Sequence, residues 1–272
     1  MSQEISLVAI TGSFFQACVE LRVLLFKILL APVLIALVSL AGRKWGPGIA
    51  GWLLGIPLNS GPILFFLVLE QGPQFASHAA FGCLIGILAW ATFTLVYAWC
   101  CLKLPWWSST ILGWIAYFAI AALLLPVRLD IIWAFAMVSL LLAAMLWAFP
   151  RVPPPDSAAT YGKYDLLLRM ATASVMVVTL TGFARLLGPL RSGILSDFPA
   201  YTTILAVFSH HHQASSAVST MKGVAVGLYT ASTFFLVLSI ALLHLTAGAS
   251  FALATTGALL VQAGSLMYVR RS

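Results

Sequence analysis

LLFKILLAPVLIALVSLAGRKWGPGIAGWLLGIPLNSG, residues 24–61, aligns without a gap on LLLRMATASVMVVTLTGFARLLGPLRSGILSDFPAYTT, residues 166–203, at a constant offset of 142. The aligned pairs that are identical or alike in charge are Lys27 with Arg169, Arg43 with Arg185, Gly46 with Gly188, Pro47 with Pro189, Gly51 with Gly193 and Pro57 with Pro199. One deletion later the match resumes at Gly82 and Gly86, which align with Gly223 and Gly227. The sequence therefore predicts a duplicated unit, a construction shared by many membrane carriers.

Composition places the chain in a lipid bilayer. Of its 272 residues, 62% are hydrophobic and only 8% are charged, which is too little polar surface to cover a water-soluble globule of this size. The apolar runs that approach the length of a membrane span predict nine transmembrane helices, at about 22–41, 49–69, 79–102, 106–125, 129–149, 166–184, 192–209, 217–243 and 249–268. A barrel is disfavoured because these runs do not alternate apolar with polar residues.

The parity of the spans predicts the arrangement of the two copies. The first repeat covers residues 23–126, a linking helix and a proline-rich polar seam cover 127–164, and the second repeat covers 165–272. Five crossings separate equivalent points, so the two four-helix repeats enter the membrane in opposite directions. Two inverted halves joined by a flexible seam are expected to rock between inward-open and outward-open states. Residues 1–22 are expected to form an interfacial segment, because the apolar stretch 5–19 is short for a crossing and carries no cleavage signal.

Basic residues set the expected orientation. With nine spans, Lys and Arg gather mainly on the side that also carries Arg270 and Arg271, which predicts a multi-pass protein of the cell membrane with a cytoplasmic C-terminus. The net charge of +7 is then an excess that faces anionic lipid, so the bilayer is the expected partner and nucleic acid is not.

Each copy is interrupted at the same place. GIPLNSGP, residues 55–62, and SDFPAYTT, residues 196–203, put proline and polar residues inside apolar runs, so a broken helix is expected near Pro57 and near Pro199. Paired broken helices are the best sequence indication of a carrier's site. The expected solute-binding residues at the breaks are Pro57, Asn59, Ser60, Gly61, Pro199, Tyr201, Thr202 and Thr203. The alternative is an ordinary kink whose backbone groups are satisfied by Ser60, Thr202 and Thr203.

Three charged residues within the spans complete the predicted site. Lys27 and Arg169 occupy equivalent positions and are expected to hold an anionic group, although either side chain could instead reach the membrane interface. Asp197 lies two residues before Pro199 and is the expected carrier of a coupling proton; the alternative is a helix cap beside water.

The remaining motifs in the sequence add little to the predicted function. The run His210, His211 and His212 is interpreted as a solvated loop and no metal site is predicted, because successive helical side chains lie ~100° apart and cannot share one ion. The glycines at 82, 86, 223 and 227 form GxxxG motifs that allow close helix packing within the chain, or in a homodimer. No catalytic or phosphate-binding motif is present, so neither an enzyme nor a cofactor is expected.

The sequence thus predicts a secondary transporter for a small anionic or zwitterionic organic solute, working by alternating access and coupled to protons through Asp197. Two other classes stay open: a non-transporting accessory subunit or assembly factor, and a membrane-embedded enzyme acting on a lipid-linked substrate.

Overall fold

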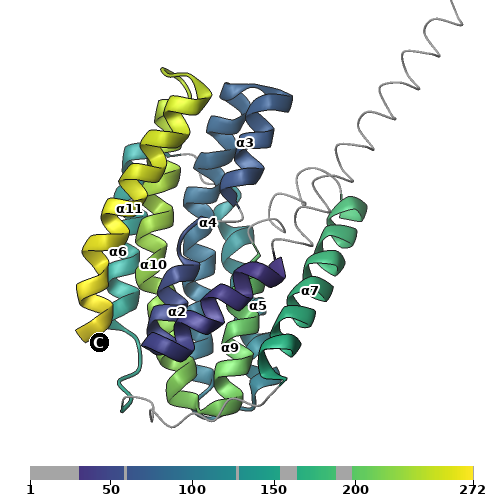
Figure 1. Cartoon of the computed structure of the whole chain (residues 1–272). Helices are drawn as coiled ribbons and strands as arrows, with labels where there is room; N and C mark the ends of the chain where they lie inside the picture. Colours follow the sequence, from purple (N-terminus) through teal and green to yellow (C-terminus); the bar gives the residue numbers. More distant parts are fainter. Residues whose placement is uncertain (1–30, 58–59, 127–128, 154–163, 188–197, 272) are drawn as a thin grey trace, which may run out of the picture.

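The computed structural model of the chain describes residues 31–57, 60–126, 129–153, 164–187 and 198–271. Every regular element in these ranges is a helix, so the expected all-α architecture is confirmed (Figure 1). Residues 31–45 are helical. The labelled helices are α2 (Pro47–Leu54), α3 (Ser60–Gln71), α4 (Pro73–Cys100), α5 (Trp106–Leu124), α6 (Ile131–Trp147), α7 (Asp165–Leu187), α9 (Ala200–His212), α10 (Ala214–Ala241) and α11 (Ala247–Arg271).

Four of the described helices, α4, α5, α10 and α11, are long and apolar enough to cross a membrane by themselves. Two further apolar helices are shorter, with 12 residues in α3 and 17 in α6. The apolar run 49–69, expected as one span, is divided into α2 and α3. Among the described residues, the structure is therefore an all-helical chain with four candidate membrane-spanning helices, which suggests a membrane protein.

The short helices α3 and α9 both begin next to a predicted break. The amide of Gly61 donates a hydrogen bond to the carbonyl of Pro57 at 2.9 Å, and the amide of Thr203 donates to the carbonyl of Pro199 at 2.8 Å. Proline is suited to the start of a helix because its missing N–H would have no partner there. Each proline therefore lies at the start of a short helix among the described residues. At 1.5 Å per residue, α3 and α9 extend only about 20 Å.

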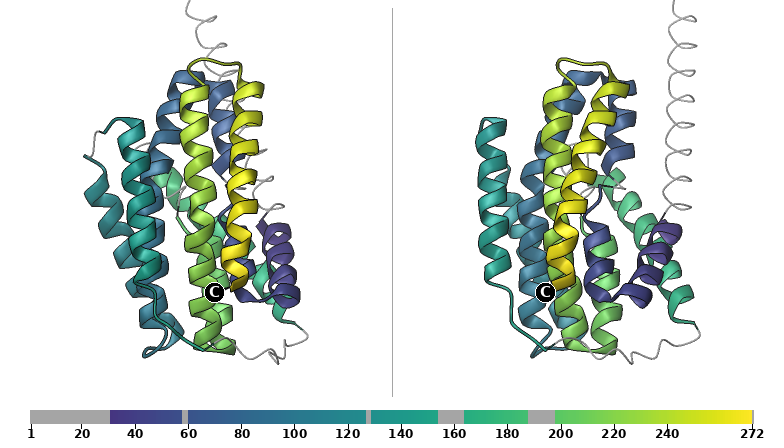
Figure 2. Two further views of the ribbon diagram at one scale, coloured as in Figure 1. Left: turned by 90° about the vertical axis from the view of Figure 1, so that its left-hand side faces the viewer. Right: turned by 60° about the vertical axis from the view of Figure 1, so that its left-hand side comes forward.

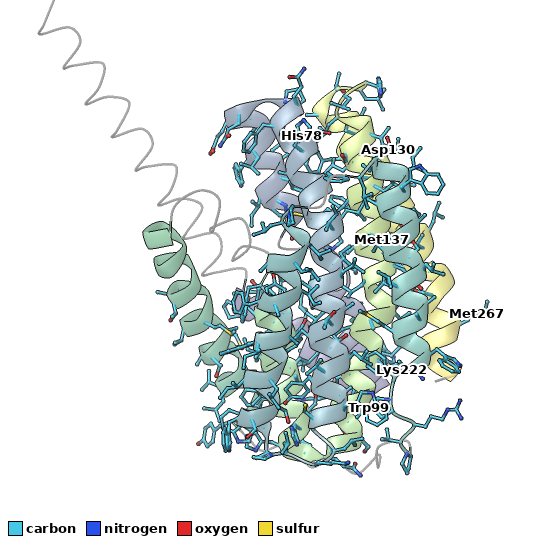
Figure 3. All side chains as sticks on the ribbon, turned by 180° about the vertical axis from the view of Figure 1, so that it is seen from behind. His78, Trp99, Asp130, Met137, Lys222 and Met267 are labelled. Carbon is cyan, nitrogen blue, oxygen red and sulfur yellow. The ribbon has the colours of Figure 1, made fainter. Side chains whose placement is uncertain are left out.

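Helices α4 and α10 run antiparallel at the centre of the bundle. Near the start of α4 and the end of α10, the hydroxyl of Ser77 donates to the carbonyl of Ser239 at 2.7 Å. At the other end, Cys101 lies 3.8 Å from the carbonyl of Ala214, the first residue of α10. Helix α6 packs against both, and α11 lies beside α10, to which it is joined at one end (Figure 2). Figure 3 shows His78 of α4 at one end of the bundle and Lys222 of α10 toward the other.

Glycine brings α2 into backbone contact with α10. A Cβ added to Gly223 would lie 2.1 Å from the carbonyl oxygen of Gly48, and one added to Gly51 would lie 2.0 Å from the carbonyl oxygen of Thr220. Gly227 makes the same kind of approach to Gly55. The GxxxG motif of α10 therefore serves helix packing within the chain.

Gly82 of α4, which aligns with Gly223, does not lie against another helix in the described part of the chain. Gly82 is exposed, and a Cβ added to it would meet nothing within 4 Å in the described part of the chain. A homodimer contact through this face stays a prediction.

One core joins the two predicted halves. The main cluster of buried apolar side chains contains Leu54, Phe93 and Leu142 together with Met221 and Leu238. Because α2 packs on α10, the expected boundary at 127–164 does not separate two independently packed bodies among the described residues. Residues 1–30, which include the expected interfacial segment, lie outside the described residues.

Replacing Gly223 by Ala is expected to destabilise the protein, because its methyl group would collide with the backbone of α2. Overpacking costs about 1–3 kcal/mol, so the thermal unfolding temperature in detergent should fall by several degrees. The matched control is Gly82→Ala, which adds the same methyl group in open space and should leave the temperature unchanged or raise it slightly. Equal effects of the two substitutions would contradict the packing of α2 on α10.

Candidate functional site

The interruption between α2 and α3 borders a cavity of about 490 Å³. Its walls come from three places: the break itself, the facing side of α10, and the facing side of α11. The break and α3 contribute Ile56, Pro57, Gly61, Pro62, Phe65 and Phe66, while α10 and α11 contribute Thr230, Phe234, Phe251, Thr255, Ala258 and Leu259. The walls are almost wholly apolar, and two threonines are the only side chains with hydroxyl groups among them. The volume is in the range of sites that hold small molecules.

A network of buried hydrogen bonds joins α2, α10 and α11 beside this cavity. Gln262 of α11, only 4% exposed, donates from its amide to the carbonyl of Trp52 at 3.0 Å and accepts a hydrogen bond from Thr230. The indole of Trp52 in turn donates to the hydroxyl of Ser265 at 2.9 Å. An unpaired polar group is costly in the apolar interior, so these bonds hold α2 in a fixed position against α10 and α11.

This network is not among the residues predicted from the sequence, although the sequence carries one signal for it. Gln262 is the single side-chain amide in the apolar run 249–268. A polar side chain at such a position needs a buried partner.

Beside Pro199, at the second predicted break, aromatic side chains pack closely together. The ring of Phe198 is stacked on Phe118, with 5.7 Å between centroids and 22° between planes. It also meets the edges of Trp114 and Tyr117 at 5.4 and 5.6 Å. These rings leave Phe198 only 8% exposed. Phe198 thus packs against α5 as part of the core.

The threonines that follow Pro199 are hydrogen-bonded within the protein. Thr202 accepts from the indole of Trp90 at 3.0 Å, and Thr203 accepts from the indole of Trp114 at 3.2 Å. The hydroxyl of Thr203 donates to the carbonyl of Pro199 at 2.9 Å, as the alternative of a self-satisfied kink expects. Tyr201 is half-buried and packs against the main core.

The structure therefore brings only part of the predicted site together. Pro57 and Gly61 line the cavity, and Ser60 is the first residue of α3 beside them. Tyr201, Thr202 and Thr203 lie at the second break, which is separately packed against α4 and α5. Lys27, Asn59 and Asp197 lie outside the described residues.

Arg169 belongs to an ion cluster at another place. Its guanidinium donates to the carboxylate of Asp165 at 2.9 and 3.3 Å, and Arg43 approaches the same carboxylate at 2.9 Å. His212 lies 3.7 Å from it, and the ring of Phe208 lies 4.8 Å from the Arg169 guanidinium carbon. Arg169 is 4% exposed, so its side chain is enclosed by protein. Arg169 is not one of the residues that line the cavity.

The charge of Asp165 is held by these cations. Burial on its own raises the pKa of the carboxyl group, but the hydrogen bonds and charge of Arg169, followed by the hydrogen bond from Arg43 and the charge of His212, outweigh it. The pKa of Asp165 therefore lies below its ordinary value, and the group is ionised at neutral pH. The cluster ties the helix at 31–45 to the start of α7 and the end of α9.

The three histidines are helical, so the expectation of a solvated loop is wrong. They form the last turn of α9, and each contacts a different element. His210 approaches the hydroxyl of Tyr97 at 3.3 Å, the ring of His211 lies 5.5 Å from that of Trp106, and His212 faces Asp165. Within the described residues no group of three metal-ligating side chains is present. Successive side chains diverge around the helix and so serve three separate contacts.

Comparison of the chain with protein-family models, with curated proteins and with solved structures finds no match. Function is therefore inferred from the geometry of the cavity and of the helices around it.

Replacing Asp165 by Asn is expected to destabilise the protein by about 3–5 kcal/mol at pH 7, because the buried guanidinium of Arg169 would lose the carboxylate that accepts two of its hydrogen bonds. The stabilising effect of the carboxylate is present above its unfolded pKa of about 3.9 and is lost as pH falls through its lowered folded pKa. The difference in unfolding temperature between wild type and variant should therefore narrow below about pH 4.

Two controls accompany this measurement. Glu70→Gln, at an exposed position, should change the unfolding temperature little. The double variant Asp165→Asn with Arg169→Gln should recover part of the loss, since it also removes the buried charge that the Asp165 carboxylate offsets. A constant difference from pH 7 to pH 3 would contradict the ionised cluster.

Proposed function

We propose that this protein is an integral membrane secondary transporter that moves a small anionic or zwitterionic organic solute by alternating access. The cavity beside the interrupted helix is the observation that carries the proposal. A helix that breaks inside hydrocarbon leaves backbone groups without intrahelical partners, and proteins accept this cost where the break lines a cavity. Broken helices of this kind form the substrate sites of many secondary carriers.

The helix ends at the break support a charged or zwitterionic solute. The C-terminal end of α2 and the N-terminal end of α3 meet at the cavity through Ile56, Pro57 and Gly61. The C-terminal end of α2 carries the negative end of its helix dipole, and the N-terminal end of α3 carries the positive end of its own. A solute with opposite charges at its head would meet a favourable field from both. Because Arg169 is paired with Asp165, the positive end of α3 is the better partner for the solute's negative group.

Helix lengths support two inverted repeats. α4 and α10 each have 28 residues and start at Pro73 and Ala214, 141 positions apart. α5 and α11 start at Trp106 and Ala247, with the same separation. The paired helices α4 and α10 run antiparallel, as inverted copies would. On this proposal the chain has nine spans, of which the second and seventh are broken at Pro57 and Pro199.

The distribution of charge supports the proposed orientation in the cell membrane. Arg43 and Lys44 end the helix at 31–45, Lys103 follows α4, and Arg151 follows α6. The indole of Trp99 donates a hydrogen bond to the carbonyl of Ala148, which places the ends of α4 and α6 side by side, and Arg43 is bonded to Asp165 at the start of α7. The C-terminus lies toward the same end (Figure 1). A cytoplasmic position of this basic end follows the positive-inside rule.

Reconstituted protein tests the proposal. Solute-induced currents are measured from proteoliposomes on a supported membrane, with panels of small anions, zwitterions and cations at two pH values. Wild type should respond to anions or zwitterions. Ala258→Trp should abolish the current, because the indole would fill the cavity, whereas Ala252→Trp on the exposed face of the same helix should leave it intact.

The same assay tests the coupling role of Asp197. The variant Asp197→Asn should lose transport driven by a pH gradient and retain solute exchange, because exchange moves no net proton. Silence of folded wild type across the whole panel would contradict the transporter and favour an accessory subunit.

A further inference from the structure

The two breaks differ in how their surroundings are filled. Under the repeat alignment, Ile56, Thr255, Ala258 and Leu259 of the cavity correspond to Phe198, Trp114, Tyr117 and Phe118 at the second break. The first set is two aliphatic residues, an alanine and a threonine. The second set is four aromatic residues, and they pack against one another with centroids 5.3 to 5.7 Å apart.

The cavity is therefore the space that aromatic rings occupy in the other copy. Both sets lie beside the proline that starts a short helix, Pro57 before α3 and Pro199 before α9. At the second break Tyr117 is 2% exposed and the rings close the site. At the first break the smaller side chains leave about 490 Å³. For scale, a dry cavity of about 150 Å³ takes up one benzene molecule.

We propose that the cavity binds the aromatic ring of the solute, and that each chain has one such site because the protein's own rings fill the counterpart. This inference rests on the proposed function and on its inverted repeats. The stacked ring of Phe198 shows which chemistry the counterpart accepts. A solute with an aromatic ring and an anionic or zwitterionic head places the ring in the cavity and the head at the dipole of α3.

The cavity walls favour a ring over a flexible chain. Phe251 meets Phe65 edge to face at 5.4 Å and 81°, and it meets Phe234 at 6.3 Å and 62°. Rings in these orientations present both edges and faces, and an added ring can pack on them in the offset or perpendicular geometry that aromatic groups prefer. An acyl chain gains only apolar contact there and loses more rotational freedom on binding.

Photolabelling in phosphatidylcholine nanodiscs tests the site directly. The probe is 4-azidobenzoate, an aromatic carboxylate, and the labelled peptides are identified by mass spectrometry. Label is expected in segments 56–66, 230–234 and 251–259, and not in 114–118 or at Phe198. Unlabelled 2-naphthoate should compete at a concentration at least tenfold lower than decanoate, which has nearly the same number of carbon atoms. Equal or better competition by decanoate would overturn the aromatic site and identify a lipid-chain groove.

Exchange of residues between the two sites gives matched variants. Thr255→Trp with Ala258→Tyr copies the rings of the filled site into the cavity and should abolish labelling. Tyr117→Ala with Phe198→Ile copies the small residues into the filled site and should add label at 114–118. If that second variant fails to elute as a monodisperse protein, Tyr117→Leu with Phe198→Leu takes its place.

Persistent labelling in the filled variant would overturn the proposal. The experiments also distinguish failure of the aromatic-site proposal from failure of the transporter proposal. Solute currents carried only by non-aromatic compounds would overturn the aromatic site and leave transport intact, whereas labelling without any current would overturn transport and leave the site.

Discussion

The backbone contact between α2 and α10 is the constraint on which the cavity depends. Glycines at 48, 51 and 55 on one helix and at 223 and 227 on the other allow the two backbones to touch. Gln262 then fixes the carbonyl of Trp52, so the end of α2 cannot shift along α10. Helix α2 ends at Leu54, and side chains of α10 and α11 line the cavity together with Ile56, Pro57 and Gly61. A cavity forms because the residues there are too small to close it.

This contact also changes which parts can move together. A sequence boundary near residues 127–164 assigns α2 to one half and α10 to the other, yet α2 is bonded to α10 and α11. On the other side of this boundary, Thr202 and Thr203 of α9 are bonded to Trp90 of α4 and Trp114 of α5. Helices α2 and α9 are thus each bonded to helices on the other side of the expected boundary. Alternating access in such an interlocked structure would move α3 relative to α10 and α11, across the apolar cavity, more readily than it would separate the two sequence halves.

Local chemistry explains what could be predicted from the sequence. Apolar runs predict the long helices, and the lack of an amide hydrogen predicts that Pro57 and Pro199 interrupt helices. The cavity walls could not be predicted this way, because Thr230 and Phe251 come from helices far along the chain and reach the break only through tertiary packing. The ion pair of Arg169 could have been predicted from the sequence, since Asp165 precedes it by one helical turn. Expecting Arg169 at the solute site ignored this local ion pair.

Access of water to the cavity from the two sides of the membrane tests the carrier account most directly. A single cysteine at Thr255, in a variant without the four native cysteines, is exposed in vesicles of either orientation to a membrane-impermeant thiol reagent. A lipid-facing control cysteine at Ile115, a position that is 59% exposed, should stay unreactive. Alternating access predicts that the cysteine at 255 reacts from both sides, and that it is protected from both by the transported solute. Reaction from neither side would contradict the account, because the cavity would then open only to lipid.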